Sequence, residues 1–212
     1  MMTVILASGT PPSHDIPLGM LRKADRVVAC DSAWRTAVAL GRMPDAVVGD
    51  GDSLGEDGRR ELSRYGIPLV IVDEQDTNDL CKAFRHALSA FRDADAGDIA
   101  ILGATGKRED HSIGNIFHLI DFASCARRVS IVTDNGVFEP VLPPGREWEA
   151  REGAPVSVFA PIPGTAISSN GLEWPLDGVV LDALWKGTLN RTTGRSFSLV
   201  VNKPAIVYLP YA

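Results

Sequence analysis

Short, uninterrupted apolar runs recur along the first two thirds of the chain, separated by more polar segments. A strand of a parallel sheet is covered on both faces, so its residues are apolar in succession rather than in alternation. The pattern therefore predicts buried parallel strands. They are expected at residues 3–8, 26–30, 45–49, 68–72, 98–103 and 128–133.

Two of the segments between these strands have the spacing of an amphipathic helix. In DLCKAFRHALSAF, residues 79–91, apolar side chains recur every three or four positions, and Thr77 is the expected N-cap. A second such pattern runs from His111. Strands that alternate with helices imply right-handed crossovers between parallel strands. The predicted fold class is α/β, with a doubly wound, mostly parallel sheet.

The pattern changes after about residue 142. The stretch LPPGREWEAREGAP is rich in Pro, Gly and charge, which is typical of a connection between domains. The apolar runs that follow are short and separated by Gly, Pro and Asn, as in a small antiparallel sheet or sandwich. We therefore expect an α/β domain in residues 1–142 and a small all-β sandwich domain in residues 143–212.

Composition narrows the classes of partner and the compartment. The 212 residues are 45% hydrophobic and 23% charged, and a net charge of −6 disfavours binding to nucleic acid. No run approaches the ~18 apolar residues of a membrane span, and the N-terminal run is too short for a signal peptide. Three widely spaced cysteines are expected to be buried thiols of a cytoplasmic protein.

Carboxylates and glycines follow four of the predicted strands. Asp31 follows the second strand, Asp50 and Asp52 the third, an acidic cluster at 73–79 the fourth, and GATGKREDH at 103–111 the fifth. Ligands of doubly wound sheets bind beyond these carboxyl ends. In an extended chain Asp50 and Asp52 would point to the same side. A cation such as Mg²⁺ would neutralise the gathered carboxylates and link them to a polyphosphate.

Each of these features also has a purely structural explanation. Asp and Gly are common in turns, and Asp79 would favour the start of a helix through the helix dipole. His111 and Asn115, one helical turn apart, would form a surface pair. The chain has no P-loop sequence, so the loop at 103–111 is the one expected to offer backbone N–H groups and Arg108 to phosphate oxygens.

Four motifs taken together resemble those of the thiamin pyrophosphokinase family. They are VVGDGDSL, QDTNDLCKA, GATGKREDHSIGN and GLEWPL, in the family's order and spacing. The resemblance implies an α/β domain that binds nucleotide and metal, followed by a β-sandwich that binds thiamin. It implies transfer of the diphosphoryl group of ATP to the hydroxyl of thiamin, giving thiamin diphosphate and AMP. It also implies a homodimer whose active sites draw on both subunits.

The resemblance further implies roles for individual residues. Asp50, Asp52 and Asp79 would hold Mg²⁺ on the triphosphate. Asp79, Arg108 and Asp110 would be catalytic, and the resemblance leaves open whether Asp79 or Asp110 accepts the proton of the attacking hydroxyl. The remaining positions would bind the nucleotide and thiamin, and they are Asp31, Gln75, Asp76, Asn115 and Tyr208.

Position 51 differs from the family pattern, and position 208 is open to two interpretations. Gly51 stands between the two aspartates where the family usually has Phe. In the segment AIVYLP the strand pattern places Ile206 and Tyr208 on one face and Val207 and Leu209 on the other. Tyr208 is accordingly expected either to cover thiamin or to pack in the core.

Three other functions fit parts of the pattern. In a D-x-D phosphatase the first aspartate would be a nucleophile, although in that class the motif follows the first strand. A glycosyltransferase would use D-x-D to hold a metal and a nucleotide sugar, and would release a nucleoside diphosphate. A non-catalytic sensor of nucleotide or thiamin would bind its ligand without turnover.

Overall fold

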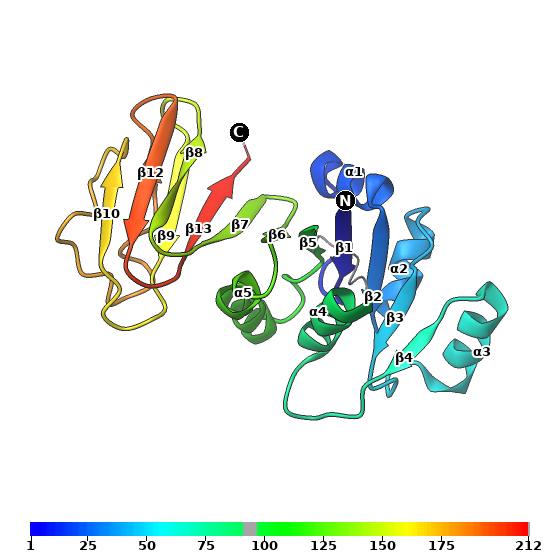
Figure 1. Ribbon diagram of the computed structural model, residues 1–212. Coiled ribbons are helices and arrows are strands. Elements are labelled where there is room, and N and C mark those ends of the chain that lie inside the picture. Colours follow the sequence, from blue (N-terminus) through cyan, green and yellow to red (C-terminus); the bar gives the residue numbers. More distant parts are fainter. Residues whose placement is uncertain (91–96, 212) are drawn as a thin grey trace.

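The computed structural model describes residues 1–90 and 97–211, and in Figure 1 all helices lie around one end of the molecule while the other end contains strands only. The helices are α1 (Asp15–Lys23), α2 (Ala33–Ala39), α3 (Gly55–Tyr65), α4 (Asp79–Ala90) and α5 (Glu109–Ala123). The strands are β1 (Met2–Leu6), β2 (Arg26–Cys30), β3 (Ala46–Gly49), β4 (Leu69–Ile71), β5 (Asp98–Leu102), β6 (Arg128–Val132), β7 (Gly136–Val141), β8 (Gly145–Glu149), β9 (Pro155–Phe159), β10 (Ile167–Asn170), β11 (Asn190–Arg191), β12 (Ser196–Val201) and β13 (Ala205–Pro210).

Most of these strands form one large sheet in the order β11-β9-β13-β7-β6-β5-β1-β2-β3-β4. The last six strands in this order, β6-β5-β1-β2-β3-β4, are parallel to one another. Each predicted apolar run forms one of them. The chain starts at β1, winds outward to β4, and then crosses back to β5 on the other side of β1. The predicted doubly wound α/β fold is confirmed, and its topological switch point lies between β1 and β5.

Helices cover both faces of the parallel strands. Ile5 of β1 belongs to an apolar cluster with α4 and α5, in which Phe84 and Phe122 stack with ring centroids 4.0 Å apart. The next residue, Leu6, belongs to the opposite cluster, together with Trp34 of α2. Because successive side chains of a strand point to opposite faces, continuous apolar runs are needed to fill both layers.

The start of α4 differs from the expected one. Asn78 caps the helix, because its side-chain oxygen accepts a hydrogen bond from the Cys81 N–H at 3.0 Å. The Thr77 hydroxyl, the predicted cap, instead donates to Glu74 at 2.5 Å. The helix ends at Ala90, and the predicted end at residue 91 lies outside the described residues.

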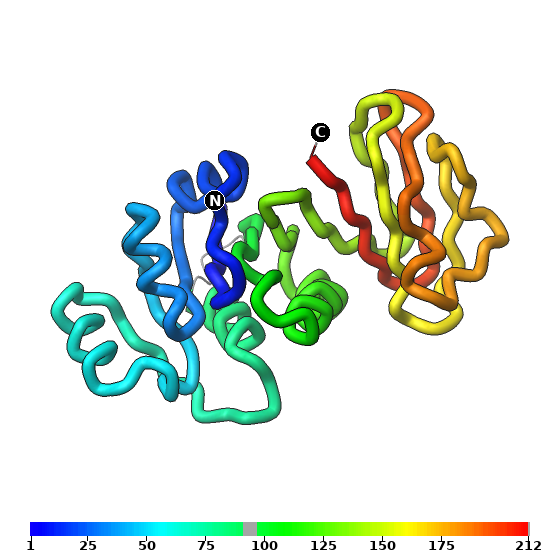
Figure 2. The backbone as a smooth tube through the Cα atoms, turned by 180° about the vertical axis from the view of Figure 1, so that it is seen from behind, coloured from blue at the N-terminus to red at the C-terminus, as the bar shows by residue number. Residues whose placement is uncertain are grey.

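Residues beyond 142 form both an extension of the large sheet and a second sheet. The stretch after 142 that was predicted to be a connection contains β8, which pairs with β12, so that prediction was wrong. β13 pairs with β7 and β9, which continues the large sheet, and β10, β12 and β8 form a separate antiparallel sheet. Figure 2 shows β13, in red, running back from the strand-only end toward the helices. The two sheets enclose a core in which Trp148 and Phe197 stack at 4.9 Å. The antiparallel sandwich is confirmed. The domain boundary at residue 142 stays a prediction, and the large sheet continues across that position through β7 and β13.

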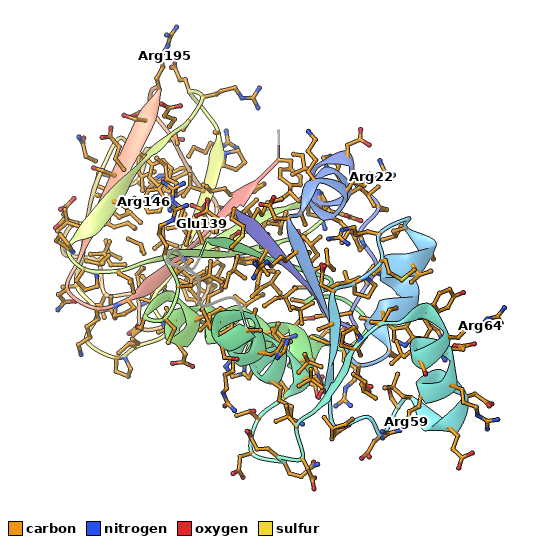
Figure 3. All side chains as sticks on the ribbon, turned by 45° about the vertical axis from the view of Figure 1, so that its right-hand side comes forward. Arg22, Arg59, Arg64, Glu139, Arg146 and Arg195 are labelled. Atoms are coloured by element: carbon orange, nitrogen blue, oxygen red, sulfur yellow. The ribbon has the colours of Figure 1, made fainter. Side chains whose placement is uncertain are left out.

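One ion pair connects the large sheet to the small one. Glu139 of β7 accepts a hydrogen bond from the Trp148 indole N–H at 2.7 Å and pairs with Arg146 of β8 at 3.0 Å. The Arg146 guanidinium also lies 4.8 Å from the centre of the Trp148 ring, and Figure 3 labels Glu139 and Arg146 close together. This contact fixes the small sheet against β7.

Two sequence expectations concern the membrane and the cysteines. Within residues 1–90 and 97–211, no helix is long and apolar enough to cross a membrane. Cys30 and Cys81 are buried thiols as expected, whereas Cys125 is exposed, so the expectation was wrong for the third cysteine. Cys125 follows the end of α5, where the chain runs over the surface toward β6.

Candidate active site

A cleft of about 480 Å³ opens at the switch point of the sheet. Its lining comes from the last residue of β2, from residues that follow β1, β3, β4 and β5, and from the beginnings of α4 and α5. These elements are far apart in the sequence. The carboxyl ends of parallel strands and the starts of the helices that follow them meet here, which explains why so many polar residues converge. The side chains of this cleft form the candidate active site.

The floor of the cleft is built from two loops that bind each other. The Gly9 N–H donates to the Gly103 carbonyl at 2.7 Å, and the Lys107 ammonium donates to the Ser8 carbonyl at 2.8 Å. Gly106 has φ +78°, and a Cβ at this position would lie 2.0 Å from the Thr10 hydroxyl oxygen. Glycine is therefore required at 106, both for the left-handed backbone and for the close approach of the two loops.

A buried lysine stands between two of the predicted carboxylates. The Lys82 side chain is 2% exposed, and its ammonium lies 3.5 Å from an Asp79 oxygen and 3.7 Å from an Asp50 oxygen. The pKa of Asp79 is raised, chiefly by burial and then by repulsion from Asp50. The pKa of Asp50 is lowered, chiefly by a hydrogen bond from the Asp52 backbone N–H and also by Lys82. The lysine thus holds two carboxylates near one point despite their repulsion.

Asp50 and Asp52 do not lie on an extended chain. β3 ends at Gly49, Gly51 has φ +77°, and the Asp52 N–H turns back to donate to the Asp50 carboxylate at 3.1 Å. The expectation that an extended backbone aims both side chains at one spot is therefore wrong. Asp50 is partly buried in the cleft, whereas Asp52 is exposed and does not line it.

Asp31 is buried directly behind this turn. It has φ +38°, and one of its carboxylate oxygens accepts a hydrogen bond from the Ser53 hydroxyl. Its other oxygen is buried and has no hydrogen-bond partner among the described residues. Asp31 does not line the cleft, but it ties the end of β2 to the turn that carries Asp50.

Comparisons with known proteins decide the family. The model of the thiamin pyrophosphokinase catalytic domain matches residues 19–132, which is more than half of the chain, and the model of the thiamin pyrophosphokinase substrate-binding domain matches residues 136–208. The chain belongs to the thiamin pyrophosphokinase family. The predicted family is confirmed, and this family transfers the diphosphoryl group of ATP to thiamin.

Individual thiamin pyrophosphokinases agree with this assignment. Thiamine pyrophosphokinase 1 of Oryza sativa subsp. japonica is 34% identical over 152 residues, which cover 66% of this chain but only 55% of that protein. The protein of Bacillus subtilis (strain 168) is 27% identical over 182 residues, covering 84% of this chain and 83% of that protein.

Solved structures show that the fold is shared along the whole chain. The thiamine pyrophosphokinase of Bacillus subtilis superposes with a TM-score of 0.78 at 20% identity, covering 100% of both chains. A thiamin pyrophosphokinase family protein of Enterococcus faecalis gives a TM-score of 0.82 at 17% identity, again over 100% of both chains.

The cleft includes half of the residues that the thiamin pyrophosphokinase motifs suggested. Its lining contains Asp50, Gln75, Asp79, Arg108 and Asn115. The other five suggested residues lie outside the lining, and they are Asp31, Asp52, Asp76, Asp110 and Tyr208.

Arg108 and Asp110 form a pair on the rim of the cleft. Both side chains are exposed, and the guanidinium binds the carboxylate through two nitrogens at 2.5 and 3.1 Å. Arg108, and to a lesser degree the His111 N–H, lower the pKa of Asp110 to about 2. Asp110 therefore holds Arg108 in place at the start of α5.

Asn115 and Tyr208 both make contacts within the protein. The Asn115 amide donates to the Ala104 carbonyl at 2.8 Å, and its oxygen accepts from the Asn78 amide at 2.9 Å. Tyr208 packs on Phe138 with ring centroids 4.3 Å apart, and burial raises its pKa. Ile206 packs in the core on the side of α4 and α5, and Val207 and Leu209 pack in the sandwich.

Gly51 also has a physical explanation in this chain. A Cβ at position 51 would lie 2.7 Å from a guanidinium nitrogen of Arg59 and 2.8 Å from the Ile71 side chain. Arg59 donates to the Gly51 carbonyl at 3.4 Å. Figure 3 labels Arg59 beside the turn that follows β3 and shows Arg64, on the same helix, projecting away from the molecule. The Phe that is usual in the family would not fit here without a rearrangement.

Lys82 and Trp174 were not predicted as site residues. Lys82 lies three positions after Asp79, and the other buried residues of this helix are apolar, so a charge among them was a usable signal. Trp174 of the motif GLEWPL is 54% exposed, while buried Asn190 binds its backbone N–H at 3.2 Å and its carbonyl at 2.7 Å. The fixed backbone thus presents the Trp174 ring to its surroundings.

The donor set fits Mg²⁺ that arrives with a nucleotide. Among the described residues, no group of three or more His, Cys, Asp or Glu side chains is arranged to hold a metal ion unaided. Asp50 and Asp79 offer hard oxygens at one place, and Mg²⁺ is usually held by one or two carboxylates together with substrate phosphates.

Proposed function

We propose that the chain is a thiamin diphosphokinase, which transfers the diphosphoryl group of ATP to the hydroxyl of thiamin and releases AMP. The observation that carries the proposal is the convergence of Asp50, Asp79 and Lys82 at the switch point of a chain that contains both family domains. The alternatives are not favoured, because the D-x-D motif follows β3 rather than the first strand and both domains match one family.

The cleft is proposed to hold the triphosphate end of ATP together with Mg²⁺. Asp50 and Asp79 would bind the ion, with exposed Asp52 joining them when the nucleotide is present. Mg²⁺ would neutralise the charge that develops on the phosphates. Arg108 lines the same cleft, together with Ala104, Gly106 and Lys107 of the loop after β5, and Arg108 would bind phosphate oxygens.

Other suggested residues are proposed to support these contacts. Gln75 lines the cleft and Asp76 is exposed beside it, so both would face the substrates at its mouth. Asn115 would keep α4 and the loop after β5 in register, since it bonds to both. Asp31 would hold the turn that carries Asp50 through Ser53.

The transfer itself needs an acceptor for one proton. The hydroxyl oxygen of thiamin attacks the β-phosphorus, the bond between that phosphorus and the oxygen of the α-phosphate breaks, and AMP leaves. We assign the hydroxyl proton to Asp79, because it lines the cleft. Both oxygens of Asp110 are engaged by Arg108 outside the lining, so Asp110 would act by positioning Arg108.

Aromatic side chains of the strand-rich part are proposed to bind thiamin, which carries a cationic ring attracted to aromatic faces. Tyr208 would do so within one protomer. The loop after β10, which holds Trp174, lies at the end of the molecule away from α2 and α3 in Figure 1. Trp174 would therefore serve the cleft of a second copy, which supports a homodimer with shared sites. The cysteines of this chain are unpaired thiols, which suits a protein of the cytoplasm.

The decisive experiment identifies the nucleotide product. The purified chain is incubated with ATP, Mg²⁺ and thiamin, and the products are separated by chromatography. We expect AMP and thiamin diphosphate in equal amounts. ADP with thiamin monophosphate would contradict diphosphoryl transfer, and binding without turnover would indicate a sensor. A phosphoenzyme on Asp50 would indicate a phosphatase.

A further inference from the structure

Lys82 presents an unusual charge arrangement that the reaction alone does not require. Its ammonium is nearly inaccessible to water and lies within 3.7 Å of both carboxylates assigned to the cation. A buried ammonium is costly unless carboxylates compensate it, and the interaction with them is strong away from water. Lys82 therefore occupies the place where the two carboxylates would attract a free divalent cation most strongly.

The charges around this point can be counted. Asp50 and Asp31 both lie close enough to influence Asp79, and Lys82 is a cation that influences the same carboxylate. Three carboxylates and one ammonium leave a net charge of −2. Without the ammonium the charge would be −3, which would attract a free divalent cation more strongly and repel an anionic cation–nucleotide complex more strongly.

We propose that Lys82 makes the cleft selective for the cation–nucleotide complex over the free divalent cation. The ammonium competes with a free cation for the Asp50 and Asp79 oxygens, which weakens its binding. When the cation arrives on a triphosphate, the same ammonium attracts the phosphate oxygens and strengthens binding. This inference rests on the proposed function, because it takes a nucleotide as the ligand of the cleft.

The inference is tested by two equilibrium measurements on the full chain. Mn²⁺ alone is titrated and followed by the electron paramagnetic resonance signal of the unbound ion. Mg²⁺ with α,β-methylene-ATP, in which the bond to be broken is replaced, is titrated by calorimetry. For Lys82→Met we expect Mn²⁺ to bind about tenfold more tightly and the nucleotide complex about tenfold more weakly.

Two other variants serve as controls. Lys82→Arg keeps the charge, so both affinities should stay within about threefold of wild type. Lys107→Met removes a second positive charge from the cleft, but its ammonium binds the Ser8 carbonyl rather than the carboxylates. Its affinity for Mn²⁺ alone should therefore stay within about twofold of wild type.

Opposite shifts of the two affinities would not arise from a merely structural lysine. If Lys82→Met weakens both ligands, or changes neither, the inference is overturned. Should this variant fail to fold even with Mn²⁺, the wild-type protein is titrated with Mn²⁺ alone and with Mn²⁺ and nucleotide together. Equal affinity for Mn²⁺ in the two titrations would contradict selectivity. If wild type binds no nucleotide, the proposed function fails, whereas the Mn²⁺ comparison still reports on Lys82.

Discussion

The two aspartates of the D-G-D turn have different surroundings, although one residue separates them. Asp50 lines the cleft and faces Lys82, whereas Asp52 is exposed and contributes its backbone N–H to Asp50. The polar turn after β3 is thus asymmetric. One carboxylate is built into the cleft, and the other is free to respond to a ligand.

We expect Asp50→Asn to lower kcat about 100- to 1,000-fold, the usual cost of removing one group that stabilises charge in the transition state. The variant should fold, because it removes one of the carboxylates that repel Asp79, while Asp79 still compensates the Lys82 ammonium at 3.5 Å. Steady-state assays of AMP release check this, with Asp57→Asn as a control, since Asp57 is exposed on α3 and pairs there with Arg60. Near-normal turnover by Asp50→Asn would rule out its assignment to the cation.

At the scale of elements, the loop between β1 and α1 is attached to the end of β6 by one carboxylate. Asp134 accepts hydrogen bonds from the N–H groups of Ser13 at 2.9 Å and His14 at 3.0 Å, and from the Ser13 hydroxyl. Burial raises the pKa of Asp134, but these hydrogen bonds outweigh it, so the pKa is lowered overall. The loop whose first residues form the floor of the cleft is therefore held by a charged group.

Asp134→Ala should lower the midpoint of thermal unfolding by about 2–6 °C at pH 7. A depressed pKa in the folded state contributes stability above the unfolded value of about 3.9, and this is lost as pH falls through the folded pKa. The difference between wild type and variant should accordingly shrink when scans are repeated near pH 3. A difference of unchanged size at low pH would show that the charge of Asp134 is not what stabilises the loop.

At the scale of the whole molecule, the cleft and exposed Trp174 lie on different parts of one chain. A homodimer with shared sites would bring the cleft of one protomer to the Trp174 of its partner. Further apolar side chains are exposed in the same strand-rich part, and they are Val180, Leu184, Trp185 and Leu189. These exposed apolar side chains would be covered if this part of the chain contacts a second subunit.

Mixing two defective variants tests this arrangement. Asp50→Asn and Trp174→Ala should each have little activity at low thiamin concentration. If sites are shared, a random mixture refolded together contains heterodimers with one intact site, and should recover about a quarter of wild-type activity. Size-exclusion chromatography should show a dimer in every sample. Mixtures no more active than the average of their components would contradict shared sites.

The sequence by itself determined the six parallel strands, the fold class and the edge of the sheet where polar residues gather. These follow from local patterns, because a strand covered on both faces must be continuously apolar and its polar residues then fall at its ends. The order of the four motifs was likewise readable along the chain, and it identified the family.

Only the tertiary structure decided how the residues of the site are paired. Lys82 is buried because α4 packs on β2 and β3, which brings its ammonium between carboxylates from two different elements. The space beside Gly51 is filled by Arg59 and Ile71, eight and twenty positions further along the chain, which leaves no room for a Cβ. The continuation of the large sheet through β13 depends on pairing with β7 across about 70 residues. Contacts between distant segments leave no local periodicity in the sequence, so no pattern along the chain predicts them.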